Sequence, residues 1–346
     1  MPFLPADSLN ELIETYGKQL YSLYEIISRH PEAFQRLVEL ISLPLFFDEL
    51  DDINNGNETD KSRKNPEILI DDTQSEKFGE YIAFVKKLFK YSKKTYFMGH
   101  NIVLILVAFG DFIFPLTMIL WQPKIEGESH ESKNDLAKTY LDRLKSESEK
   151  RSVPLDFVDI SFDSAYHVQK VVDAARDAGL RVTTKAKAHY VYSFDGQSMR
   201  TKEIIETVKE RQWNSFQPGN DYQRYLVNHS HYGDLVLVIR RRLKKKPKEG
   251  EEKYTYDMLI STFPPYRAFQ INRRYKKRWK IELHFKYYKQ YLSLGKTSYQ
   301  RSGSVKSNVY TVALNGLFVA LFRKKYHRKI SFRKAVKLIY QKLNYT

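Results

Sequence analysis

The sequence contains no cysteine. This absence excludes disulfide bonds, thiolate zinc sites and cysteine nucleophiles. The first residues, "MPFLPADSLNELIETYGK", also lack the basic head and apolar core of a signal peptide. We therefore expect a cytoplasmic protein.

Acidic residues are few relative to basic ones. The chain has 41 Asp and Glu against 58 Lys and Arg, which gives a formal net charge of +17 over 346 residues. A charge of this size favours a polyanionic partner, either nucleic acid or an anionic membrane surface. Hydrophobic residues make up 42% of the chain, which is typical of a globular protein with a buried core.

Long apolar runs are scarce as well. One run, residues 101–121, has the length of a membrane-spanning helix. Its centre is Gly110-Asp111, Pro115 follows, and both halves are rich in Ile, Val and Phe. Two buried strands joined by a tight turn explain this pattern better than a span, so we expect a hairpin and no membrane partner.

The remaining pattern alternates between strands and helices. Two helices are expected within residues 7–45, and the polar residues 48–65 are typical of a linker. Next come a strand, a weak helix at 76–92, the hairpin, a helix at 133–150, and a strand, a helix and a strand up to residue 187. This order predicts an α/β fold with a mixed sheet flanked by helices.

The second half changes character twice. Residues 188–262 are strand-rich and include a basic hairpin that starts at Arg240. The segments 265–294 and 308–322 are predicted to be helical, and a basic tail follows them. In so basic a chain we expect Arg240 and Arg241 to contact phosphates.

Three carboxylates occupy positions that suit phosphoryl chemistry. Asp72 and Asp163 each end a predicted strand, and Glu282 lies on a basic predicted helix. Magnesium-dependent phosphoryl transfer needs a few carboxylates that converge from different elements. Alone, each aspartate could cap a helix, and Glu282 could pair with Arg278 or Lys286. Their joint placement in a basic chain favours a metal site.

The predicted helix around Glu282 adds cations at helical spacing. Tyr275, Arg278, Glu282 and Lys289 are separated by 3, 4 and 7 residues, so they share one helical face. Arginine suits bidentate phosphate contacts, lysine suits point-charge contacts, and a tyrosine can stack on a base or sugar. We expect this face, with Lys286 beside it, to bind DNA.

The pattern Tyr275-x2-Arg278-x3-Glu282-x6-Lys289 resembles the Y-R-E-K signature of DDE transposases from bacterial and archaeal insertion sequences. Two further stretches resemble the aspartate motifs of the same group. "IDDTQSEKFG" is similar to the first motif and favours Asp72 over the preceding aspartate, and "ISFDSAYH" is similar to the second. The strand "YDMLIST" resembles the one that leads into the Glu helix.

This resemblance implies an RNase H-like core with a β-strand insertion and a two-metal site. Asp72, Asp163 and Glu282 would ligate two Mg²⁺ ions, for which Mn²⁺ could substitute. Tyr275, Arg278 and Lys289 would contact the transposon end. The implied partners are double-stranded DNA, as terminal inverted repeats and target, and a second copy of the chain in a homodimer. The implied location is the prokaryotic cytoplasm, in association with the nucleoid.

The implied chemistry is cleavage of the transposon ends through a hairpin intermediate, followed by joining of their 3′-hydroxyls to target DNA. Two alternatives remain open: a nuclease or resolvase of similar fold that does not join strands, and a non-catalytic DNA-binding descendant. An aromatic residue of the insertion would hold a flipped base, for which Trp213, Tyr254 and Tyr256 are candidates.

Five regions are expected on this basis. They are a helical N-terminal region that could bind DNA ends (1–65), the first part of the catalytic core (66–187), the β-rich insertion (188–262), the second part of the core with the Glu helix (263–322) and the basic tail (323–346).

Overall fold

The structure is a computed structural model. It describes residues 28–57, 65–79, 81–90, 93–124, 130–245, 249–296, 299–326 and 330–344. The chain divides into two compact units, of which the first comprises Met1–Thr139 with Lys280–Thr346 and the second comprises Tyr140–Trp279. The first of the two helices predicted within residues 7–45 lies outside the described residues.

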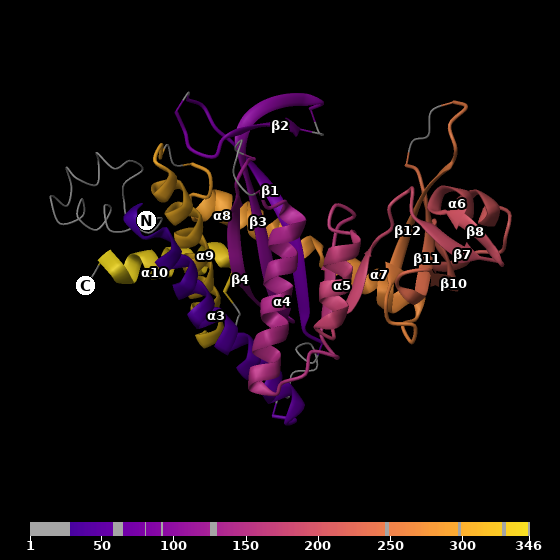
Figure 1. Cartoon of the computed structure of the whole chain (residues 1–346), viewed down its shortest axis with the longest axis horizontal. Helices are drawn as coiled ribbons and strands as arrows, with labels where there is room; N and C mark the ends of the chain where they lie inside the picture. Colours follow the sequence, from indigo (N-terminus) through magenta and orange to yellow (C-terminus); the bar gives the residue numbers. More distant parts are fainter. Residues whose placement is uncertain are drawn as a thin grey trace. The chain divides into compact units, whose positions relative to one another are not determined.

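The sheet of the first unit is built around one long strand, β3 (Thr95–Phe109). It pairs antiparallel with β1 (Glu67–Glu76), with β4 (Phe112–Trp121) and with β2 (Lys86–Lys90) (Figure 1). β3 and β4 confirm the predicted hairpin, and Gly110 adopts φ +61° in its turn.

The helix predicted at residues 76–92 is wrong. β1 continues to Glu76, and β2 occupies residues 86–90. The apolar residues of this stretch have no clear period, and pairing with β3 decides their conformation.

Helices cover one face of this sheet. α8 (Trp279–Tyr291), α9 (Ser302–Lys325) and α10 (Phe332–Asn344) share a core with alternate residues of β1, β3 and β4. α3 (Pro31–Asn54) packs on α9 and β4. It extends past the predicted linker boundary at residue 48, because Leu50 is buried and the buried Glu49 carboxylate pairs with Lys324 of α9.

α9 is the one described helix that is long and apolar enough to cross a membrane. Within the part of the chain that the structure describes, 72% of its apolar window is buried inside the protein. Its contacts with α3, β4 and α10 give it the environment of a core helix.

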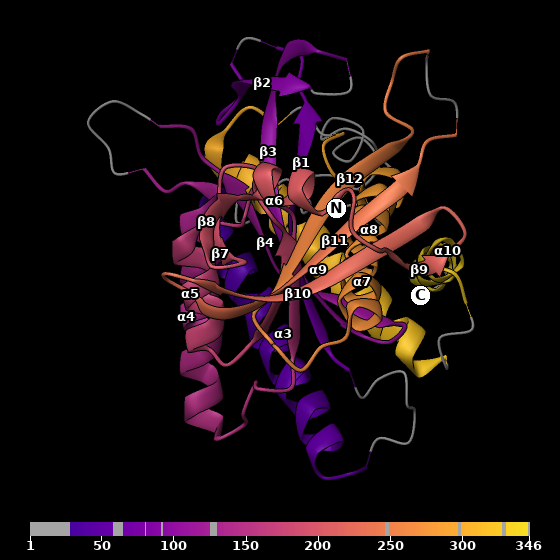
Figure 2. The same ribbon diagram turned by 90° about the vertical axis from the view of Figure 1, so that its right-hand side faces the viewer.

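The second unit contains a mixed sheet in the order β5-β6-β12-β11-β10-β7-β8. Its strands β12, β11 and β10 lie side by side in Figure 2. β5 (Asp159–Phe162) and β6 (Arg181–Lys185) are parallel, and the other neighbours with a defined register are antiparallel. The strands of the predicted β-rich segment are β7 (Val191–Phe194), β8 (Gln197–Arg200), β9 (Asn214–Gln217), β10 (Asn220–His229), β11 (Gly233–Leu243) and β12 (Tyr254–Ser261).

The helices of this unit connect the strands. They are α5 (Gln169–Asp177), α6 (Thr201–Val208) and α7 (Ala268–Lys277), together with most of α4 (Lys133–Arg151). The predicted mixed α/β fold, with helices flanking the sheet and a β-rich segment, is confirmed.

The helix predicted over residues 265–294 is two helices. α7 ends at Lys277 and α8 begins at Trp279. Between them the Arg278 N–H donates to the Tyr275 carbonyl, three residues back, at 3.2 Å, which interrupts regular α-helical bonding. Tyr275 therefore lies on one helix, and Glu282 and Lys289 lie on the next.

Candidate active site

β1 changes from a buried to a half-exposed strand where the aspartates begin. Its residues from Glu67 to Ile70 are buried, whereas Asp71 and Asp72 are partly exposed. Because side chains alternate along a strand, Asp72 shares a face with Ile70, and Asp71 shares the opposite face with Thr73. The Asp72 carboxylate accepts a hydrogen bond of 2.9 Å from the Lys133 ammonium at the start of α4.

α8 is tied to the other face of β1. The Lys289 ammonium donates to Thr73 Oγ1 at 2.7 Å and to the Gln74 carbonyl at 2.8 Å. Burial and the neighbouring Lys90 lower the pKa of Lys289 below its ordinary value. Beyond α8, the Gly295 carbonyl accepts a bond of 3.0 Å from the ammonium of Lys77, which follows β1. α8 and β1 therefore run in the same direction.

Glu282 lies two helical turns before Lys289, on the same side of α8. Seven residues of helix span about 10 Å, the length of roughly three strand residues. Counted back from the Lys289 contact, that distance leads to the part of β1 that holds the aspartates. Leu69 and Ile281 belong to the same core cluster, in agreement with this placement. Glu282 and Lys289 thus lie along the side of β1 that Asp71 and Thr73 share, whereas Asp72 points to the opposite side of the same strand.

The position of α8 depends on a close approach to α9. Tyr288 of α8 is fully buried against Gly316 of α9. A Cβ atom at Gly316 would lie 2.7 Å from the Tyr288 hydroxyl oxygen, which is too close for van der Waals contact. Only glycine fits there, since the buried ring has no room to move. Lys286, by contrast, is exposed on the outer side of α8.

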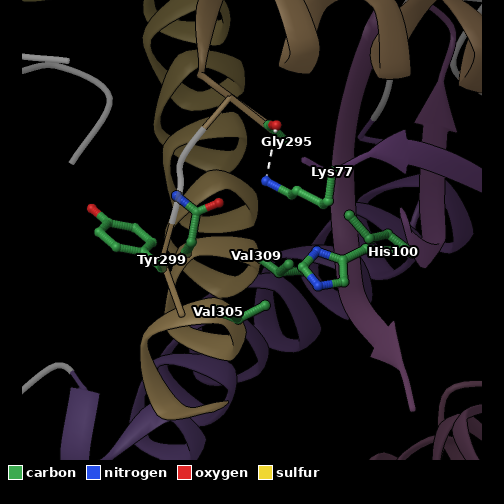
Figure 3. Close-up of a pocket in the computed structure, with 8 residues that line it drawn as sticks. Lys77, His100, Gly295, Tyr299, Val305 and Val309 are labelled. Atoms are coloured by element: carbon green, nitrogen blue, oxygen red, sulfur yellow. Dashed lines mark hydrogen bonds between the residues drawn. The ribbon is translucent and has the colours of Figure 1, made fainter. Parts of the chain in front are cut away.

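A small hollow lies beside the Lys77–Gly295 hydrogen bond (Figure 3). Its lining includes His100, Tyr299 and Val309. Burial lowers the pKa values of Lys77 and His100, and the His100 Nε2 atom lies 2.8 Å from the Ala83 carbonyl. These contacts fix the loop after α8 against the end of β1.

In the second unit, Asp163 directly follows β5. Its Oδ1 atom accepts a hydrogen bond of 2.8 Å from the Ala165 N–H, and its carbonyl accepts one of 3.3 Å from Thr184. α5 begins only at Gln169, so Asp163 stabilises a turn at the strand end and does not cap a helix. A turn of this kind presents a carboxylate at the sheet edge.

Two buried ion pairs hold α7 against the sheet of the second unit. The Arg274 guanidinium donates to Asp159 of β5 at 2.5 Å, and the Tyr266 hydroxyl donates to the same carboxylate at 2.6 Å. Arg274 and Asp159 are both almost completely buried. This pair could not be predicted from the sequence, because its members are 115 residues apart.

The second ion pair concerns Arg240, which we expected to bind DNA. Its guanidinium is 5% exposed and donates to both carboxylate oxygens of Asp257 at 2.7 Å and to Asn272 of α7 at 2.8 Å. Burial alone would raise the pKa of Asp257, but Arg240 and then Arg242 hold it below its usual range. Arg240 is therefore an interior residue and does not lie on the surface, contrary to the prediction.

Arg241 lies in an aromatic cluster with the three candidate stacking residues. Its guanidinium is 4.7 Å from the ring centres of Trp213 and Tyr254, and it pairs with Asp221 at 2.8 Å. Tyr256 contacts Trp213 with the ring centres 6.0 Å apart. Cations between aromatic faces are stabilised by the ring quadrupoles. The sequence-predicted aromatics thus form one partly exposed cluster.

Tyr275 and Arg278 complete the predicted set. Tyr275 is half-buried beside a small core cluster, burial raises the pKa of its hydroxyl, and the Arg278 guanidinium lies 5.7 Å from its ring centre. Among the described residues, no group of three His, Asp or Glu side chains is arranged to hold a metal ion. Asp72 and Glu282 belong to the first unit, and Asp163 belongs to the second.

The residues nevertheless fit the chemistry of a magnesium site. All three predicted ligands are carboxylates, and hard oxygen donors are those that Mg²⁺ prefers. The Asp72 carboxylate already holds a cation, the Lys133 ammonium.

Comparison with known proteins identifies the family. Residues 62–315 match the model of the transposase DDE domain. Among solved structures, the chain is similar to the piggyBac transposase in a cryo-EM synaptic complex with hairpin DNA, with 11% identity and a TM-score of 0.45. The match covers 80% of this chain and 52% of that one, so it spans about half of that transposase. No curated protein matches. Because the family model covers most of its length, the chain belongs to the transposase DDE-domain family.

Proposed function

We propose that this protein is a DNA transposase of the Y-R-E-K group, which cuts transposon ends and joins their 3′-hydroxyls to target DNA. The observation that supports it most directly is the alignment of α8 with β1. In a chain of the DDE family, this alignment puts a second carboxylate, Glu282, and the cation Lys289 beside the strand that carries Asp71 and Asp72.

In this proposal Asp72, Asp163 and Glu282 hold two divalent cations, most simply Mg²⁺. When bound, such ions activate the attacking oxygen and stabilise the leaving oxygen of a phosphodiester. The Lys133 ammonium would leave Asp72 as the metal loads, because both cations compete for the same carboxylate.

The basic residues would orient the strand that is cut. Lys289 is anchored to the β1 backbone, so its charge has a fixed position relative to the aspartates. A phosphate nearby would raise its lowered pKa and favour the charged form. Arg278 would bind a second phosphate, and the half-buried Tyr275 would pack against the sugar or base.

The proposed reaction consumes only water and DNA. Water attacks the phosphorus at the transposon end, and the bond to the 3′-oxygen breaks. The new 3′-hydroxyl attacks the opposite strand to form a hairpin, which a second water opens. The released 3′-hydroxyl then attacks target DNA and displaces another 3′-oxygen. Each joining step exchanges one phosphodiester bond for another, so no external energy source is required.

A cleavage and joining assay tests this proposal. Labelled duplex with the sequence that flanks the gene is incubated with the chain, Mg²⁺ and a target plasmid. Strand joining supports a transposase, cutting alone supports a nuclease, and binding alone supports a non-catalytic descendant.

The matched variants are Glu282→Gln and Lys286→Gln. Glu282→Gln should lower cleavage by at least about a thousandfold with unchanged DNA affinity, because it removes a charge from the site and no phosphate contact. Lys286→Gln, one turn further on the exposed side of α8, should cut at an unchanged rate with saturating DNA but bind DNA more weakly, because it removes a predicted phosphate contact and no carboxylate. Normal cutting by Glu282→Gln would refute the assigned role.

A further inference from the structure

A second basic surface lies outside the predicted signature, on β2 and the first part of β3. From Tyr81 to Gly110 the sequence has five lysines and no acidic residue. Four of these lysines, Lys86, Lys87, Lys93 and Lys94, are exposed, and Lys90 is half-exposed. We call residues 86–90 and 93–98 the basic ribbon.

The basic ribbon is a two-stranded projection from the sheet. β3 pairs with β1 from residue 99 and with β4 from residue 101 onwards. The preceding residues, 95–98, pair with β2 (Figure 1). The ribbon therefore extends beyond the body of the sheet, where two antiparallel strands present side chains on both faces.

Aromatic rings hold the lysine side chains along this ribbon. The Lys86 ammonium lies 5.0 Å from the Trp121 ring centre, Lys87 lies 4.9 Å from Tyr96, and Lys90 lies 5.6 Å from Phe97. Such contacts reduce the freedom of the flexible lysine stems and keep the charge at defined positions. Tyr96 is itself 64% exposed.

Hydrogen bonds through Gln74 connect the ribbon with Lys289, a predicted DNA-binding residue of the first unit. Gln74 Nε2 donates to the Phe89 carbonyl of β2 at 3.4 Å, and the Lys289 ammonium donates to the Gln74 carbonyl. The charge of Lys90 also lowers the pKa of Lys289. A phosphate backbone at Lys289 would thus be attracted further along the ribbon.

We propose that the basic ribbon is a separate contact surface for double-stranded DNA, which it binds through phosphates on the duplex that continues past the cutting site. Lys90 pairs with Glu76 at 3.7 Å, and the other four lysines, which are exposed, complement a polyanion. A two-stranded ribbon is also narrow enough to follow a groove. The role as a transposase gives this surface its substrate, so the inference rests on the proposed function.

Salt dependence of DNA binding tests the ribbon. The full chain carrying Glu282→Gln is titrated with a labelled duplex of the flanking sequence from about 50 to about 200 mM salt. Adding Lys86→Gln, Lys87→Gln and Lys93→Gln should reduce the slope of log affinity against log salt by up to about 2.7, since each lost phosphate contact contributes about 0.9. The single change Lys93→Gln should reduce it by up to about 0.9.

The matched control removes three lysines elsewhere, Lys145, Lys150 and Lys202, of which the first two pair with glutamates of α4. Its slope should not change. An unchanged slope in the ribbon variant, with an unchanged unfolding midpoint, would overturn the inference, and so would an equal loss in the control. Loss of binding to anionic lipid vesicles, with DNA binding intact, would overturn it in favour of a membrane surface.

The experiments distinguish an error in the inferred DNA binding by the ribbon from an error in the proposed function. If the unmodified chain cuts and joins the flanking DNA while the ribbon variant keeps the full salt slope, the ribbon inference fails and the function stands. If the chain neither cuts nor joins, yet the ribbon variant loses its share of the slope, the ribbon binds DNA and the catalytic proposal fails.

Discussion

At the scale of single residues, Asp71 and Asp72 differ mainly in the direction of their side chains. Asp72 turns to the face of β1 where Lys133 meets it, and Asp71 turns to the face that Thr73 presents to Lys289. The Asp71 Oδ1 atom also accepts a bond of 2.9 Å from the Asp72 N–H. Adjacent carboxylates of equal charge can therefore be separated by experiment.

Asp72→Asn should abolish cleavage and leave the fold intact, because the amide keeps the shape of the side chain but loses the charge that holds a cation. Asp71→Asn is the matched control and should retain a substantial part of the cleavage rate. Single-turnover cleavage of labelled DNA measures both. If Asp71→Asn were the inactive variant and Asp72→Asn cut normally, the first metal ligand would have to be reassigned.

A second residue-scale effect concerns His284 of α8, which is buried and contacts Phe332 at the start of α10. Burial lowers its pKa to about 4, against the opposing effect of a 2.8 Å contact between Nδ1 and the Lys280 carbonyl. The positive charges of Arg323 and Lys280 lower it further. Because the pKa is depressed in the fold, the stabilisation is present above pH about 6.5 and is lost as the pH falls towards 4.

The free energy of unfolding should therefore fall between pH about 7 and pH about 4, with a contribution of order 3 kcal/mol from His284. Urea unfolding at a series of pH values measures the change. His284→Gln should lose this share of the pH dependence, whereas the same change at the exposed His30 should not. Identical pH profiles for all three proteins would contradict the prediction.

At the scale of elements, the buried pair of Arg274 and Asp159 joins the two elements that carry predicted functional residues in the second unit. Asp163 lies four residues after Asp159, just beyond the end of β5, and Arg278 lies four residues after Arg274, just beyond the end of α7. One ion pair thus sets the distance between the strand end and the helix end. Arg274 acts through these neighbours and is a positioning residue.

Arg274→Met should lower the free energy of unfolding by about 3–5 kcal/mol, because it leaves the Asp159 charge buried without its cation. Arg273→Met changes the neighbouring exposed arginine and should have almost no effect on stability. Urea unfolding gives both values. A loss below about 1 kcal/mol for Arg274→Met would show that Tyr266 alone satisfies the carboxylate.

The accuracy of prediction from sequence differed between elements for physical reasons. The β3–β4 hairpin was predictable because Gly110-Asp111 marks its turn locally. β2 was not, since pairing with β3 decides its conformation, and the break at Arg278 was not visible in the spacing of the signature. Arg240 was misplaced because only the strand register sets it opposite Asp257. Asp163 follows β5 directly, as predicted, whereas the prediction that Asp72 ends its strand is wrong, because β1 continues to Glu76 through its pairing with β3. Lys133 as a partner of Asp72 also required the fold.

At the scale of the whole molecule, the predicted catalytic residues are divided between two compact units. Asp72 and Glu282 belong to the unit formed by both ends of the chain, and Asp163 belongs to the unit formed by its middle. If these carboxylates serve one catalytic centre, the effects of removing them on the cleavage rate should not multiply, because the loss of one ligand already removes most of the activity.

The double variant Asp163→Asn with Glu282→Gln should therefore cut no more slowly than the slower of the two single variants. Single-turnover rates, measured with enough protein to detect residual cleavage, provide the comparison. Losses that multiply would instead show that the two carboxylates contribute to separate steps or separate sites.

The contact between Tyr288 and Gly316 has a consequence for related genes. A gene copy that keeps the three carboxylates would be counted as intact on those residues alone. Here a copy could keep Asp72, Asp163 and Glu282 and still be inactive, because any side chain at position 316 would push α8 away from α9 and move Glu282 with it. The residue at position 316 should therefore be checked, together with the three carboxylates, when a copy is judged intact.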